Sequence, residues 1–178
     1  MGIIEREFKL RIDQATVRDR KAMVEINKAA APFWHKLRHL NAALKEKRVF
    51  IAYVGRIPAG FLIWTKDFYS HYFIDLIVVH PQMRRHGVAS AMIKAMENFS
   101  AGNKLFSSTN KSNKAMQSVF EREGFVKSGF ITHLDRNDPE LIYYKRSPAK
   151  SAAPKTKSRS KPKRRPRPAH KRKKGRKR

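Results

Sequence analysis

The chain has 178 residues, with 41 Lys and Arg against 14 Asp and Glu, which gives a formal net charge of +27. Residues 147–178 hold 16 of these basic residues and no acidic one, so residues 1–146 carry a net charge of +11. There is no cysteine, which excludes a disulfide framework, a thiolate zinc site and a cysteine nucleophile. No apolar run approaches the roughly 18 residues of a membrane span, and charged residues interrupt the start at once. A soluble, cytoplasmic protein without a membrane partner is predicted.

The first half of the chain alternates strand and helix signals. Thr16 and Asp19 form a capping pair, and the apolar residues after it recur at helical spacing. Pro32 can open a second helix, because its missing N–H costs nothing at the first helical position. Gly55 and Arg56 are typical of a two-residue hairpin turn. The strands predicted in this half are Phe8–Ile12, Val49–Val54 and Ala59–Thr65.

The second half contains the most apolar run, Tyr72–His80, which predicts a central strand buried on both faces and interrupted only by Asp75. An amphipathic helix follows from Val88 to Phe99, and a later helix is predicted to end at Gly124. The remaining predicted strands are Lys104–Thr109, Phe125–Leu134 and Leu141–Lys145.

The last residues of the chain differ in composition from the rest. Residues 147–178 contain five prolines and no aromatic or branched aliphatic residue, so they cannot bury enough apolar surface to offset the entropy lost on ordering. We therefore predict one folded domain over residues 1–146 and a disordered polybasic tail over residues 147–178.

The tail suggests a partner. Lys and Arg at the density of residues 150–178 attract nucleic acid through counterion release, without reading its sequence. Nucleic acid or the ribosome is therefore the predicted partner, and the absence of aromatic residues argues against base stacking by the tail itself. The alternatives are a nuclear localisation signal in a eukaryote, a solubilising extension, and self-acetylation at its nine lysines.

The turn after the central strand is basic and opens the next helix. The first N–H groups of a helix have no intrahelical partner and the helix dipole adds positive potential, so this turn predicts an anion site suited to phosphate. Arg84 and Arg85 add charge and donors, while Gly87 and Ala89 let a ligand approach the backbone. The segment lacks the Gly-Lys-Ser/Thr ending of a P-loop and the glycines of a dinucleotide fingerprint.

Two blocks of this sequence resemble motifs of the GNAT N-acetyltransferase superfamily. Arg84-x-x-Gly87-x-Ala89 after the central strand resembles its acetyl-CoA signature, and Asn113 followed by Phe120–Phe125 resembles its helix that ends in a Gly-Phe pair. The resemblance implies an α/β (α+β) fold, with a mixed, mostly antiparallel central sheet flanked by helices. It also implies that the fourth and fifth strands splay apart and hold acetyl-CoA in the gap.

The resemblance further implies the chemistry of the site. Acetyl-CoA would be the co-substrate, and an amine would attack the thioester directly while the Val79 N–H stabilises the oxyanion. Backbone groups of the central strand would hold the pantetheine, amides of the basic turn would hold the pyrophosphate, and Asn113 would contact the cofactor arm. The residues implied in acetyl-CoA binding are Ile77, Val78, Val79, Arg84, Arg85, His86, Gly87, Val88, Ala89, Ser90, Asn113 and Phe120.

Asp75 is the candidate catalytic base. Residues 75, 77 and 79 of a regular strand share one face, so Asp75 is expected to point the same way as Ile77 and Val79. A lone carboxylate in an apolar strand is costly unless it is paired or used. The alternative is a structural role, in which Asp75 accepts hydrogen bonds from a loop or pairs with an arginine.

Phe120 departs from the family pattern. Relatives often carry a tyrosine there, which protonates the departing thiolate, and phenylalanine cannot do so. Either Tyr143 or Tyr144 substitutes, or the thiolate leaves unaided. The alternative for Phe120 is packing in the core, which its helical spacing with Met116 favours.

The predicted function is an acetyl-CoA-dependent N-acetyltransferase acting on a primary amine of a protein or small molecule. One alternative is a CoA-binding protein associated with nucleic acid or the ribosome, with weak or no transferase activity. Another is a transferase acting on an RNA-linked amine. His35 and His39 have a metal-compatible spacing, but no third ligand accompanies them, so no metal site is predicted.

Overall fold

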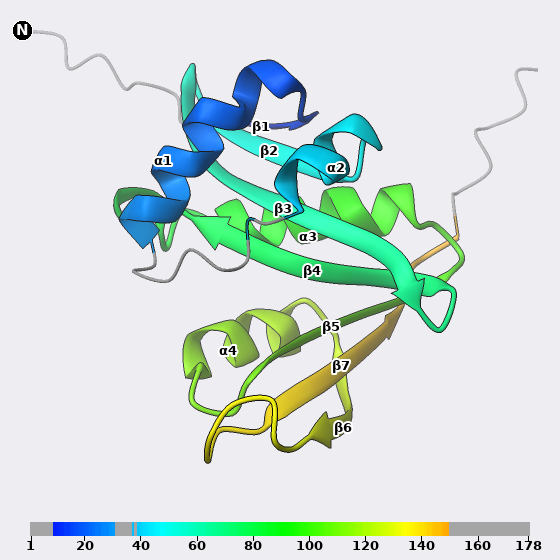
Figure 1. Cartoon of the computed structure of the whole chain (residues 1–178). Helices are drawn as coiled ribbons and strands as arrows, with labels where there is room; N and C mark the ends of the chain where they lie inside the picture. The colour runs from blue at the N-terminus through cyan, green and yellow to red at the C-terminus, as the bar shows by residue number, and fades with distance from the viewer. Residues whose placement is uncertain (1–8, 31–36, 38, 150–178) are drawn as a thin grey trace, which may run out of the picture.

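The protein is represented by a computed structural model, which describes residues 9–30, 37 and 39–149 (Figure 1). These residues form a seven-stranded sheet in the order β1-β2-β3-β4-β5-β7-β6. Neighbouring strands are antiparallel except for β4 and β5, which are parallel. The strands are β1 (Leu10–Gln14), β2 (Val49–Val54), β3 (Ile57–Phe68), β4 (His71–Val79), β5 (Lys104–Asn110), β6 (Val126–Ile131) and β7 (Glu140–Arg146).

Helices cover both faces of this sheet. On one face α3 packs over the apolar cluster that contains Met92, Met96 and Leu105, and on the other face α1 and α2 pack over a cluster around Ile51 and Phe61 (Figure 1). The predicted mixed, mostly antiparallel sheet flanked by helices is therefore confirmed. The helices are α1 (Arg20–Ala30), α2 (Leu40–Lys45), α3 (Val88–Phe99) and α4 (Lys114–Arg122), with short 3₁₀ turns η1 (Val17–Asp19) and η3 (Pro81–Met83).

The predicted capping pair before α1 is confirmed. The Thr16 hydroxyl accepts the Arg18 N–H, and the Asp19 carboxylate accepts the Thr16 N–H at 2.7 Å and the Tyr53 hydroxyl at 2.6 Å. Burial opposes ionisation of Asp19, but these hydrogen bonds outweigh it and lower its pKa. Burial and the bond to Asp19 raise the pKa of Tyr53 to about 12. The cap thus ties the start of α1 to strand β2.

Most predicted elements are present, with shifted ends. The first strand runs from Leu10 to Gln14 and β3 extends through Phe68, while Phe8 lies outside the described residues. Gly55 has a φ of +60° in the β2–β3 turn, as the hairpin requires. The second helix is described only as α2, because Pro32 also lies outside the described part.

The central strand differs from its prediction. The strand packs against the apolar clusters on both faces of the sheet, but only Ile74 and Val78 are buried and most of its other residues are partly exposed. The reason is its pairing: β4 and β5 are in register only from Tyr72 to Ile74, and beyond that point no ladder joins them. Figure 1 shows the two strands diverging toward α4. The predicted splay between the fourth and fifth strands is therefore confirmed.

Gly60 on β3 allows α3 to lie close to the sheet next to this splay. A Cβ atom there would lie 2.7 Å from the Val78 carbonyl oxygen and 3.2 Å from Cγ1 of Val88. Side chains larger than hydrogen are therefore excluded at this position. The beginning of α3 consequently sits beside the end of β4.

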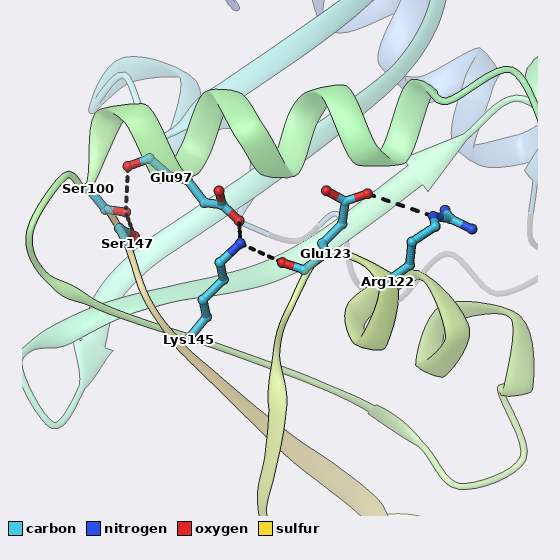
Figure 2. A network of polar contacts seen from close by, with 6 residues as sticks. All are labelled: Glu97, Ser100, Arg122, Glu123, Lys145 and Ser147. Atoms are coloured by element: carbon cyan, nitrogen blue, oxygen red, sulfur yellow. Dashed lines mark hydrogen bonds and ion pairs between the residues drawn. The ribbon is translucent and has the colours of Figure 1, made fainter. Parts of the chain in front are cut away.

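Lys145 links the two halves of the splayed sheet (Figure 2). Its ammonium group on β7 forms an ion pair with Glu97 of α3 at 2.6 Å and donates to the Glu123 carbonyl after α4. The side chains of Lys145 and Glu97 are only 21% and 10% exposed. Nearby, the Ser100 and Ser147 hydroxyls are 2.7 Å apart, which fastens the end of β7 to the end of α3.

We expect Lys145→Met to lower the free energy of unfolding by about 2 kcal/mol, because it leaves the Glu97 carboxylate buried without a counter-charge. Adding Glu97→Gln should restore part of this loss, since the remaining group is neutral. Urea unfolding followed by circular dichroism measures both effects. Lys127→Met is the matched control, because the Lys127–Glu121 pair is more than half exposed and should contribute less than about 0.5 kcal/mol. Equal effects of the two lysine substitutions on the free energy of unfolding would contradict the claim that burial makes the Lys145–Glu97 pair more important for stability.

The described chain ends just beyond β7. Ser147 is 2% exposed and its N–H donates to the Asn103 carbonyl, so it packs with the folded part. Residues 150–178 lie outside the described residues, and the division into a domain and a disordered tail stays a prediction. Among the described residues, no helix is long and apolar enough to cross a membrane.

Candidate functional site

A cleft of about 880 Å³ opens where β4 and β5 part. Its walls come from the end of β4, the turn before α3, the first turn of α3, one side of α4 and the end of α1. The described residues that line it are Asn27, Ala30, Leu76, Ile77, Val78, Val79, Met83, Arg84, Arg85, Gly87, Val88, Ala89, Ser90, Asn113, Ala115, Met116, Ser118, Val119 and Arg122.

The turn between β4 and α3 has a strained backbone. Arg85 has a φ of +68° and Gly87 a φ of +75°, and a left-handed arginine costs of order 1 kcal/mol. Such alternating backbone conformations turn successive N–H groups toward one side and form a concave anion site. The first bond of α3 runs from the Ala91 N–H to the Gly87 carbonyl, so the amides of residues 88–90 precede the helical ladder. This geometry fits the predicted phosphate site.

The two arginines of the turn have different surroundings. The Arg84 guanidinium donates to the Ala30 carbonyl at 3.2 Å and so holds the C-terminal end of α1 against the turn. Arg85 lines the cleft beside it. His86 does not line the cleft, and its Nδ1 lies 2.8 Å from the Arg84 carbonyl oxygen. Arg84 therefore orders the turn as well as adding positive charge.

The α4 wall supplies one predicted residue and one that sequence reasoning missed. Asn113 lines the cleft, but its Oδ1 caps α4 by accepting the Met116 N–H and its Nδ2 donates to Thr109. Arg122, at the end of α4, reaches across and donates to the Ser90 hydroxyl at 3.3 Å. It adds a third guanidinium to the cleft, from a part of the chain that the turn motif does not include.

Asn27 on α1 is a second residue that the sequence did not single out. It is 5% exposed and lines the cleft, and its side-chain amide makes no hydrogen bond within the described residues. Because Asn27 lines the cleft and its amide is not engaged elsewhere in the described part of the chain, this group is available to a ligand. No local signal could have found it, because α1 lies far from the turn in sequence.

Asp75 does not lie where regular strand alternation places it. In the β3–β4 ladder, Ile63 pairs with Leu76 and Trp64 with Ile74, so Asp75 is the extra residue of a bulge. Ile74 and Ile77 both contribute to the cluster under α3, which puts Asp75 on the opposite face from Ile77. Asp75 is exposed, and no hydrogen bond or ion pair holds its carboxylate in the described part of the chain. The expected shared face is therefore wrong, whereas its catalytic role stays untested.

Phe120 lies in the core rather than on the cleft wall. It is 1% exposed, and its ring packs against Phe125 and Tyr143 at centroid distances of 5.3 and 5.0 Å. This placement favours the packing alternative over cofactor contact. Tyr143 is fully buried and burial raises the pKa of its hydroxyl, while Tyr144 points to the opposite face of the sheet. Neither tyrosine lines the cleft.

The cleft thus brings together most of the predicted cofactor residues. Asp75, His86 and Phe120 do not line it. No group of three or more metal-ligating side chains is present within residues 9–30, 37 and 39–149, and His35 lies outside them. The predicted residues that do line the cleft are Ile77, Val78, Val79, Arg84, Arg85, Gly87, Val88, Ala89, Ser90 and Asn113.

Comparisons with known proteins identify the family. The model of the acetyltransferase (GNAT) family matches residues 14–125. A GNAT-family acetyltransferase from Bacillus cereus ATCC 10987 is 32% identical, with a TM-score of 0.72 over 78% of this chain and 98% of that one. A search of curated proteins gives no match.

Two more distant structures share the fold. The ribosomal-protein-S18-alanine N-acetyltransferase of Escherichia coli is 18% identical, with a TM-score of 0.66 over 83% of this chain and 98% of that one. A putative streptothricin acetyltransferase from Bacillus anthracis str. Ames, solved in complex with acetyl coenzyme A, is 17% identical, with a TM-score of 0.63 over 78% and 99%. The family match covers more than half of this chain, and the chain belongs to the GNAT family of acetyltransferases.

Proposed function

We propose that this protein is an acetyl-CoA-dependent N-acetyltransferase, which transfers the acetyl group to a primary amine by direct attack. The observation that carries the proposal is the cleft between β4 and β5, which ends at the strained, amide-rich turn before α3. An acyl carrier with a pyrophosphate needs such a combination, an apolar channel with an anion site at one end.

The anion end would hold the pyrophosphate. The amides of residues 88–90 and the left-handed backbone at Arg85 and Gly87 supply donors, and Arg85 and Arg122 supply charge from two sides. The Arg84 guanidinium is already bonded to α1, so its main contribution is to hold the turn in shape. Anion binding here rests on the backbone more than on any one side chain.

The end of β4 would hold the acyl arm. The His80 N–H donates to Ala59 on β3 at 2.9 Å. Backbone N–H groups alternate in direction along a strand, so the N–H groups of Ile77 and Val79 point away from β3, toward the gap. These groups can bind the pantetheine, and the Val79 N–H can stabilise the oxyanion that forms when the amine attacks the thioester.

Asp75 is the proposed acceptor of the amine proton. The carboxylate is exposed and unbonded at the bulge where β4 leaves β5, on the face from which an acceptor can approach the gap. It can take the proton directly or through a water molecule. The thiol of CoA has a pKa of about 8.5, so its thiolate can leave without a proton from the phenol that Phe120 lacks.

A second function is favoured by one observation. Phe120 cannot donate a proton and neither Tyr143 nor Tyr144 lines the cleft, which would suit a protein that binds acetyl-CoA and transfers the acetyl group slowly or not at all. Incubating a lysate with the protein and isotope-labelled acetyl-CoA, followed by mass spectrometry, separates the two functions. Labelled amines support the transferase, and their absence with acetyl-CoA bound supports the second function.

Asp75→Asn should lower turnover about 100-fold on the acceptor so identified, because the general base is lost, while acetyl-CoA affinity changes less than about twofold. Turnover is followed by release of the CoA thiol, and affinity by titration calorimetry. Asp67→Asn, at another exposed carboxylate on the neighbouring strand β3, is the control and should keep full turnover. Full turnover of Asp75→Asn from about pH 6 to 9 would assign Asp75 a structural role.

Gly87→Glu should weaken acetyl-CoA binding at least about tenfold, because it places a negative charge beside the proposed pyrophosphate site. Gly102→Glu is a matched control. Gly102 has a φ of +78° and, like Gly87, open space around a Cβ atom, but it follows the other end of α3. Both variants therefore carry the same backbone strain, and only their positions differ. Calorimetry should show that the first variant loses acetyl-CoA binding and that the second keeps it. Equal affinities of the two folded variants would show that the turn does not take part in binding.

We also propose that the tail binds nucleic acid, free or in the ribosome, and that the protein acts in the cytoplasm. A chain that ends at Ala149, beyond the packed Ser147, should keep its melting temperature and its acetyl-CoA affinity. Its affinity for duplex DNA should fall sharply, since 16 basic residues are gone. For the intact chain, neutralising about six phosphates predicts a slope of about −5 for the logarithm of the binding constant against the logarithm of the salt concentration, measured by fluorescence anisotropy. Equal duplex binding by the shortened chain would place the contact on the folded domain.

A further inference from the structure

Four aromatic side chains from four neighbouring strands form a continuous row across the sheet. Phe68 of β3 and Phe73 of β4 stack at a centroid distance of 4.8 Å, and Phe106 of β5 lies 5.2 Å from Phe68. Tyr144 of β7 extends the row at 5.1 Å from Phe106. The strand register explains this, because Phe73 is directly opposite Phe106, and Phe106 is directly opposite Tyr144. We call these four residues the aromatic row.

The aromatic row lies on the face of the sheet opposite α3. Tyr72, Leu105 and Tyr143, which alternate with its members along three strands, belong to the cluster under α3. The described helices on the other face, α1 and α2, pack over β2, β3 and the far end of β4 instead. Each ring of the row is partly exposed, and the row continues into Tyr69, which is 84% exposed.

Positive charge borders one side of the aromatic row. Lys104 and Arg146 are exposed, directly opposite each other, and two residues from Phe106 and Tyr144, so alternation places them on the same face. The His71 ring stacks on Phe106 at 5.7 Å. The polybasic tail begins at Lys150, four residues after Arg146. Exposed carboxylates lie on the other side of the row: Asp75 is where β4 leaves β5, and Asp67 accepts the hydroxyl of Thr65, which is directly opposite Phe73.

We propose that the aromatic row is a binding site for single-stranded nucleic acid, with bases stacked on the rings and phosphates beside Lys104 and Arg146. This goes beyond the proposed acetyl transfer. Every base has a π-face, so a row of rings binds single strands with little sequence preference, whereas the bases of a duplex are already stacked. The centroids of the Phe68 and Tyr144 rings lie 5.2 and 5.1 Å from that of Phe106, so the row offers room for about two bases.

The aromatic row predicts a preference for single-stranded over duplex nucleic acid, which the tail alone cannot give. Counterion release by the tail acts on any polyphosphate, and it favours the denser charge of a duplex. Stacking on the row adds affinity for single strands only. The intact protein should therefore bind a single strand more tightly than the tail's charge predicts. Only this additional affinity for single strands should depend on the rings.

The test uses the full-length chain and a fluorescent RNA of about ten nucleotides, free or annealed to its complement, followed by anisotropy. Phe106→Leu and Tyr144→Leu keep apolar bulk but remove the rings, and each should weaken single-strand binding about tenfold while duplex affinity changes less than about twofold. Phe130→Leu is the matched control. Phe130 is 68% exposed and pairs with Leu141, which faces the core under α3, so it lies on the opposite face.

The charged border has its own test. Lys104→Gln and Arg146→Gln should each reduce the salt slope for the single strand by about 0.7, the effect of losing one phosphate contact. Lys94→Gln, at an exposed lysine of α3 on the other face, should leave the slope unchanged. Circular dichroism and acetyl-CoA affinity show whether a ring substitution disturbs folding. If it does, the proposal is tested by these charge variants instead.

Three outcomes would overturn the proposal. The first is folded ring variants that bind the single strand as tightly as the unaltered chain. The second is an equal loss for single strand and duplex, which would assign binding to charge alone. The third is a dimer, seen by light scattering, that dissociates in Tyr144→Leu, since the row would then be covered by a second copy of the chain.

Discussion

The site depends on the parting of β4 from β5 in the middle of the sheet. At the last paired position, the Ser107 hydroxyl donates to the Ile74 carbonyl at 3.0 Å. Beyond this position the backbone groups of β4 and β5 that face each other do not pair in a ladder. Interior strands that part leave donors and acceptors that need other partners. The cleft places these groups beside the amides at the start of α3, so one break in the sheet creates both the channel and its anion end.

A sheet that opens in its centre needs connections elsewhere, and α3 provides them. Its first turn is held near β4 because Gly60 lets Val88 and Met92 approach the strand. Its last turns are held to β7 by the Glu97–Lys145 ion pair and by the hydroxyls of Ser100 and Ser147 (Figure 2). The helix therefore spans the gap, and the same rigid element that presents amides to the cleft keeps the two halves of the sheet at a set distance.

Local sequence patterns were sufficient to predict much of this structure. The capping pair at Thr16 and Asp19, the Gly55 turn and the basic turn at Gly87 each depend on a few adjacent residues, so the sequence carries them directly. The bulge at Asp75 depends on how β3 and β4 align, and strand alternation alone predicted the wrong face. Asn27 and Arg122 reach the cleft from helices distant in sequence, which no local pattern indicates. The aromatic row was likewise hidden, since cross-strand register brings its members together.

The bulge also decides how two kinds of ligand can share this sheet. Anion-binding groups gather on the side of α3 and α4, while the bulge turns Asp75 to the other face, which also carries the aromatic row. An acyl donor and a polymer bound at these two places would meet only through the gap between β4 and β5. The carboxylate stands at that gap, so a strand held on the row would carry an attached amine or protein toward the proposed base without competing for the cofactor's phosphate site. Binding on the row would then raise the effective concentration of the acceptor, which is the advantage a second binding surface gives to a transferase.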